Sequence, residues 1–361
     1  MRGRRSAGWL LGLLMVACGG GGGPAGGDSS ATDTPPLTAS QLALLVAEGD
    51  ATSEAIASAY QQARGIPAAN VIRVPVDSRS DEISAADFAS LKASIDARLG
   101  GDVQATLITW TRPSRVAGSC KMSITSALAF GFDARWCANG CQTTDASLFY
   151  DSASHRPFTD LGMRPSMMLG AATLTEAQAL IARGVAADGL ISSGRATGQA
   201  WLVRTSDAAR STRFADFINL ANSSVPCLVF HYVDNAAGSG SDLVINQDDV
   251  MFYFTGLPGV AQIASNRWLP GAAADHLTSF GGVLPDGNGQ MPSTEWLRAG
   301  ATASYGTVDE PCNYTDKFPR ASVLVARYRR GDTLLEAYWK SVHWPGQGLF
   351  LGEPLARPWA R

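Results

Sequence analysis

A short glycine-bounded segment, GAAADHLTSFGG at residues 271–282, gathers the side chains best suited to hydrolytic chemistry. It contains His276 with Ser279 three positions later, and the chain has only four histidines. An imidazole within hydrogen-bond reach of a hydroxyl can take its proton and turn it into a nucleophile, provided a carboxylate orients the ring. Asp275 or Glu310 could supply that carboxylate, and Asp309 stands beside Glu310 in an acidic pair. The tentative catalytic residues are therefore His276, Ser279, Asp309 and Glu310.

The same segment also fits a purely structural role. Asp275 and Ser279 are residue types that cap helices and turns, and His276 could bond the backbone. Adjacent residues point in different directions, so Asp275 is poorly placed to orient its own neighbour. No Gly-x-Ser-x-Gly elbow surrounds Ser279. Two functions stay open: a binding or assembly protein, and a peptidase- or esterase-like hydrolase with a site near His276.

The cysteines predict a disulfide. Cys137 and Cys141 flank an Asn-Gly turn in the sequence CANGC, and Cys120 precedes Cys137 by 17 residues. We expect one disulfide inside this trio, with a connectivity that the sequence does not fix. The alternative is a zinc site of three cysteines completed by His155, although the paired Cys-x-x-Cys spacing of structural zinc sites is missing. No metal is expected on balance.

The amino terminus predicts export. Residues 1–17 combine a basic start with a short apolar run, which is typical of a signal peptide and too short to cross a bilayer. The run ends in Met-Val-Ala before Cys18, a pattern similar to the bacterial lipobox, whose cysteine carries lipid. Residues 18–37 are rich in glycine, proline and serine and predict a tether. We expect a lipid-anchored protein of the bacterial cell envelope that meets the membrane through its anchor.

Composition narrows the function further. The chain of 361 residues is 45% hydrophobic and 17% charged, as in globular proteins, with a net charge of −3. This balance gives no electrostatic reason to expect nucleic acid as a partner. Neither a Gly-x-Gly-x-x-Gly fingerprint nor a phosphate loop is present, so no cofactor is expected.

The elements that must position these side chains alternate between strand and helix. Apolar or β-branched runs predict strands, and helical periodicity predicts helices between them. Strands are expected at 42–50, 69–76, 104–112, 200–206, 226–233, 250–257 and 301–308. Helices are expected at 52–65, 84–100, 174–189, 206–221 and 293–300. The alternation predicts an α/β fold with a largely parallel sheet, flanking helices and Rossmann-like layering.

The same pattern suggests a division of the chain. We expect an N-terminal α/β unit at 38–113, an irregular cysteine-containing region at 114–165 and a C-terminal α/β unit at 166–361, packed as one or two subdomains. Binding sites in such sheets gather beyond the carboxyl ends of the strands. The segment 271–282 should lie at that rim, near Asp309 and Glu310.

Much of the chain beyond the tether resembles one family of exported bacterial proteins that has no assigned activity. The resemblance rests on residues 53–72, 271–282, 296–312 and 331–359. It implies export and an α/β fold, and it implies no reaction. A weaker resemblance is to gingipain- and caspase-type peptidases, which share the sheet and a late Gly-Ala-x-Ala strand like residues 300–303. Those enzymes need a His-Gly pair, but the present strand ends in Thr255-Gly256, and Ser279 stands near the place of their cysteine.

Overall fold

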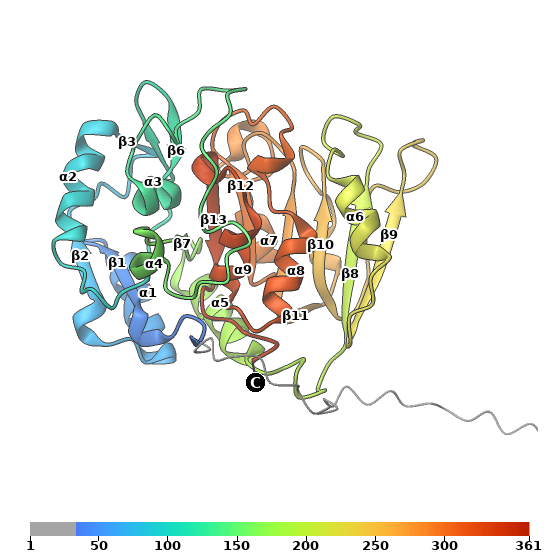
Figure 1. The fold of residues 1–361 in the computed structure, drawn as a ribbon, viewed down its shortest axis with the longest axis horizontal. Helices are drawn as coiled ribbons and strands as arrows, with labels where there is room; N and C mark the ends of the chain where they lie inside the picture. Colours follow the sequence, from blue (N-terminus) through green and yellow to red (C-terminus); the bar gives the residue numbers. More distant parts are fainter. Residues whose placement is uncertain (1–33, 361) are drawn as a thin grey trace, which may run out of the picture.

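A ten-stranded sheet forms the centre of the molecule in the computed structural model, which describes residues 34–360 (Figure 1). The expected signal peptide, Cys18 and most of the tether lie outside these residues. In sheet order the strands are β2 (Val71–Val74), β1 (Leu42–Ala47), β4 (Ala105–Ile108), β7 (Ser166–Met168), β13 (Gly348–Gly352), β12 (Ala303–Thr307), β11 (Trp268–His276), β10 (Val250–Thr255), β8 (Gly198–Arg204) and β9 (Leu228–Asp234).

The sheet is mostly parallel, as the alternation of strands and helices predicts. Every pair within β2–β1–β4–β7 and within β12–β11–β10–β8–β9 is parallel. Between these groups lies β13, which is antiparallel to β12 and meets β7 at a single registered pair. The expected N-terminal and C-terminal units therefore contribute strands to one continuous sheet.

Helices cover both faces of this sheet. They are α1 (Ala51–Arg64), α2 (Ala85–Asp96), α3 (Ile124–Phe130), α4 (Pro157–Leu161), α5 (Leu174–Ala187), α6 (Phe214–Ala221), α7 (Thr294–Ala299), α8 (Ala321–Arg329) and α9 (Leu334–Ser341). On one face α1 packs against α5, and on the other α8 packs against α6 and α9. The result is the three-layer α/β arrangement expected for Rossmann-like layering.

Local sequence explains where the helices begin and end. Helix α1 starts after Asp50, whose carboxylate accepts hydrogen bonds from the first-turn N–H groups, and ends at Gly65 in the left-handed conformation. Ser84 caps α2 as its sequence pattern predicts. Thr333 and Glu336 form a reciprocal capping box at the start of α9, as the Thr-x-x-Glu spacing favours.

The region 114–165, expected to be irregular, contains several short elements. Its strands β5 (Arg115–Ala117) and β6 (Lys121–Ser123) join β3 (Glu82–Ser84) in a second, three-stranded sheet. This sheet lies at the end of the molecule opposite the carboxyl terminus (Figure 1). The chain entering this sheet contacts the carboxyl edge of the main sheet: the hydroxyl of Ser114, just before β5, accepts a hydrogen bond from the N–H of Leu284, which follows β11.

The core has the composition that a parallel sheet requires. Strands β1 and β10 are buried at every position, and both are continuous apolar or aromatic runs. One large cluster of buried side chains extends through both expected units. No helix within residues 34–360 is long and apolar enough to cross a membrane.

Candidate functional site

Strand β11 carries the pair that the sequence singled out. Residues 271–276 were expected at a turn on the rim, but they are the second half of this nine-residue strand between β10 and β12. Asp275 and His276 are both fully buried and, as neighbours in a strand, point to opposite faces. Only residues 277–282 occupy the rim that was predicted for the whole segment.

His276 is held by two hydrogen bonds. Its Nε2 lies 3.1 Å from the carbonyl oxygen of Met291, and the indole N–H of Trp296 donates to its Nδ1 at 3.0 Å. Nδ1 must therefore be the acceptor and Nε2 the protonated nitrogen, which defines a neutral tautomer. Burial lowers the pKa of His276 to about 3. With both nitrogens engaged, the ring has none available to accept a proton from Ser279.

Asp275 forms a buried ion pair on the other face. Its Oδ1 lies 2.7 Å from Nη1 of Arg213, and both side chains are almost inaccessible to solvent. The Arg213 guanidinium also donates to the carbonyl oxygen of Thr255 at the end of β10. Burial raises the pKa of Asp275, and the neighbouring Arg213 opposes that rise. The ion pair joins the start of α6 to the ends of two central strands, so its role is structural.

The remaining tentative catalytic residues lie at the same edge but are engaged elsewhere. Ser279 is largely buried, and its backbone carbonyl accepts a hydrogen bond from the Thr307 hydroxyl at the end of β12. The Asp309 carboxylate accepts from the N–H of Gly140 at 3.1 Å. The Glu310 carboxylate accepts from the N–H of Cys312 at 2.8 Å. The structure thus brings these residues to one rim without assembling an acid–base chain around His276.

Two disulfides link segments of the chain at this rim. Cys120 and Cys137 are bonded, which confirms a disulfide within the predicted trio. Cys141, the third member, pairs instead with Cys312, 171 residues further along the chain. These bonds consume the thiolates that the zinc alternative needed, and His155 lies 2.7 Å from Glu336. Disulfides of this kind indicate an oxidising, extracytoplasmic compartment.

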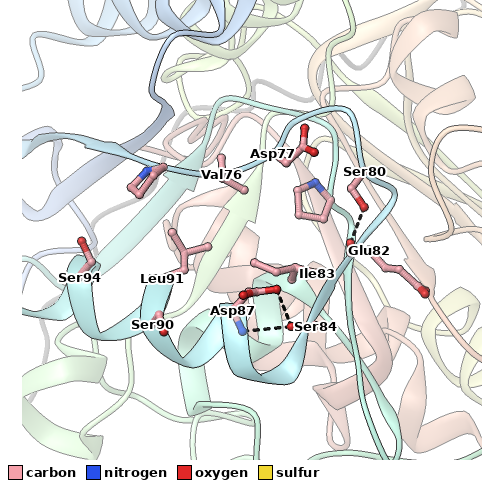
Figure 2. Close-up of a pocket in the computed structure, with 12 residues that line it drawn as sticks. Val76, Asp77, Ser80, Glu82, Ile83, Ser84, Asp87, Ser90, Leu91 and Ser94 are labelled. Atoms are coloured by element: carbon pink, nitrogen blue, oxygen red, sulfur yellow. Dashed lines mark hydrogen bonds between the residues drawn. The ribbon is translucent and has the colours of Figure 1, made fainter.

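A cavity of about 460 Å³ opens near the carboxyl ends of β2 and β4, and Figure 2 shows the side chains that line it. Its walls are the segment after β2, strand β3, the first turns of α2 and Pro113. Val76, Ile83 and Leu91 form an apolar centre (Figure 2). This volume lies within the range typical of small-molecule sites.

Carboxylates and hydroxyls surround that apolar centre. The polar lining residues are Asp77, Glu82, Asp87, Ser80, Ser84, Ser90 and Ser94, and no described lining residue is basic. Asp77 is paired with Arg79, and Glu82 with Arg115. Asp87 accepts a hydrogen bond from Ser84 at 2.7 Å, and no cation contacts it in residues 34–360. The cavity consequently presents a net negative charge.

The sequence contained a clue to this cavity. The run DSRSDEIS at 77–84 is dense in carboxylates and hydroxyls and directly follows a predicted strand, where α/β proteins place their sites. What the sequence alone could not supply was the approach of α2 and Pro113, which close the walls.

Comparisons with known proteins indicate neither a family nor a function for this chain. No family model matches the sequence, and neither the curated proteins nor the solved structures contain a match.

Proposed function

We propose that this chain is a lipid-anchored binding protein of the bacterial cell envelope, and that the acidic cavity takes up a small organic amine. The observation that carries the proposal is the cavity itself: three carboxylates and four serine hydroxyls around an apolar centre, with no basic side chain in the lining. An ammonium group would meet Asp87 and the carboxylates beside it, while the hydroxyls could accept its remaining N–H groups. The carbon chain of the ligand would cover Val76, Ile83 and Leu91.

The place where the expected tether enters the fold supports this role. The last residue of the expected tether is held at the amino edge of the sheet, where Leu37 donates its N–H to Glu336 before the chain enters β1. The cavity follows the carboxyl ends of β2 and β4, on the opposite edge. A lipid at Cys18 would therefore be joined to the described chain at the edge of the sheet opposite the cavity.

The experiment that tests ligand binding is calorimetric titration of the mature protein with spermidine, and with a neutral diol of similar length. Spermidine should bind and the diol should not. Asp87→Asn should weaken binding about two- to fivefold, the effect of one partly exposed ion pair. Asp96→Asn is the matched control, because it makes the same charge change on the same helix outside the cavity. Equal affinity in wild type and D87N would refute the proposed site.

Anchoring has its own test. Cys18→Ser should release the protein from membranes into the soluble fraction of a detergent-free lysate. If the variant still sediments with membranes, the lipid assignment is wrong.

The hydrolase alternative rests on His276 and Ser279, and the hydrogen bonds of the imidazole argue against it. Labelling of Ser279 by a fluorophosphonate probe, lost in His276→Gln, would establish that alternative.

A further inference from the structure

A second cavity, of about 330 Å³, lies between α5, α7 and the chain that leaves β7. It shares no lining residue with the acidic cavity, so a ligand bound here is independent of the proposed function. Ala171, Ala179, Leu180 and Leu297 give it apolar walls, and Arg183 and Arg298 are its basic residues. The volume is near the lower limit for small-molecule sites, which favours a compact ligand.

Arg183 is the unusual member of this cavity. Its Nη2 donates to the carbonyl oxygens of Leu297 and Ala301 at 2.9 and 3.1 Å. Its Nε is buried without a hydrogen-bond partner, and no carboxylate lies within ion-pair distance in residues 34–360. Burial lowers the pKa of this guanidinium, and no carboxylate offsets the effect. An arginine that is largely withdrawn from water and lacks a counter-ion is energetically unfavourable.

Most buried cations of the described chain have a carboxylate partner; Lys317 is an exception, and its ammonium donates to the carbonyl oxygen of Gly140. Arg64 meets Glu353, Arg213 meets Asp275, and Lys340 meets Asp332. These pairs follow the usual rule that buried charges are matched. Arg183 departs from that rule at the wall of a cavity.

The second guanidinium strengthens the positive field. Arg298 is paired with Glu176 and Glu295 and remains partly exposed. The Glu176 carboxylate also accepts the N–H of Ala172, so it is already engaged by two donors. Arg298 is thus neutralised by its carboxylate partners, and Arg183 is the guanidinium of the lining that has no carboxylate partner within residues 34–360.

We propose that this cavity binds a small organic carboxylate with an apolar body. The carboxylate takes the place of the missing counter-ion of Arg183, for which the planar guanidinium is well suited. The apolar body lies against Ala179, Leu180 and Leu297. Arg183 thereby has two roles: its Nη2 bonds hold the end of α7, and its Nη1, which makes no hydrogen bond within residues 34–360, donates to the ligand.

The test is ligand-observed saturation-transfer NMR titration of the mature protein with hexanoate and with hexanamide, which has the same carbon chain but no charge. Hexanoate should bind and hexanamide should not. Arg183→Gln should weaken hexanoate binding at least about tenfold, the effect of losing a hydrogen bond to a charged group. Arg329→Gln is the matched control, because it removes an exposed arginine outside the cavity.

A second variant keeps the test informative if removal of Arg183 disturbs α7. Ala179 is solvent-exposed and lines the cavity, so Ala179→Phe should fill the space without disturbing the core. It should abolish hexanoate binding with an unchanged melting temperature. The proposal is overturned if wild type does not bind hexanoate, if A179F binds it as wild type does, or if a folded R183Q retains full affinity.

Discussion

Protonation of His276 should control a large part of the stability of this protein in mild acid. The unfolded chain takes up this proton near the ordinary pKa of 6.5, whereas the folded chain does so only at about 3. Protons therefore favour the unfolded state between these values, and the stability contributed by the neutral ring is lost as the pH falls through that window. A protonated Nδ1 would also place two N–H donors, its own and that of Trp296, against each other.

The magnitude follows from linkage. Between pH 8 and pH 5 the free energy of unfolding should fall by about 2 kcal/mol through His276 alone, because the unfolded state gains about 1.4 kcal/mol for each pH unit below 6.5. This figure is insensitive to the folded pKa as long as that pKa lies well below 5. Nearby Arg213 and Arg210 act in the same direction by disfavouring a second positive charge.

The assay is urea unfolding of the mature protein and of His276→Gln at pH 8, 6.5 and 5. Gln can both donate and accept, and it does not titrate. The loss of stability between pH 8 and pH 5 should therefore be about 2 kcal/mol smaller in H276Q than in wild type. The other three histidines are present in both proteins, so their contributions cancel in the difference. If both proteins lose the same stability on acidification, the buried neutral imidazole is not the cause and the reasoning fails.

Two further predictions concern the two disulfides and the buried ion pair near the carboxyl edge of the sheet. The free energy of unfolding should fall by about 5 kcal/mol in the double variant Cys141→Ser/Cys312→Ser and by about 3 kcal/mol in Cys120→Ser/Cys137→Ser, because the loops that the two disulfides close differ tenfold in length. Equal losses in urea unfolding would contradict the loop-closure argument. Arg213→Met should cost about 3–5 kcal/mol in the same assay, since it leaves a buried carboxylate without its cation. A further exchange of that carboxylate for an apolar residue should restore much of the loss, and failure to do so would contradict the ion-pair explanation.

The strands with strong apolar or β-branched character could be predicted, and so could the helices with clear caps. Asp50, Ser84 and Thr333 mark helix starts because their side chains bond the adjacent backbone, which is a local interaction. Strand β11 was missed because its glycine and alanines have low strand propensity, and only neighbours on both sides make them a central strand. Strand β13 was missed for a similar reason: it is short and begins and ends with glycine, but it is paired along its whole length with β12.

The candidate site was less predictable because it depends on contacts distant in sequence. The residue types around His276 suggested a base, but its role is set by Met291 and Trp296, which reach it from the rim and from α7. The pairing of Cys141 with Cys312 likewise required the fold. Neither cavity could be located from sequence, because each is the space left between elements that meet only after the sheet has formed.

The position of β13 has a consequence for how the chain reaches its native state. This strand follows every other described strand in the sequence, but it occupies the middle of the sheet, between β7 and β12. A nascent chain that has not yet released residues 348–352 has two open sheet edges where the finished protein has a continuous layer. The final closure must wait until residues 348–352 have been synthesised, and it joins segments far apart in sequence, which is slow. Until then the chain exposes open sheet edges and depends on protection from aggregation.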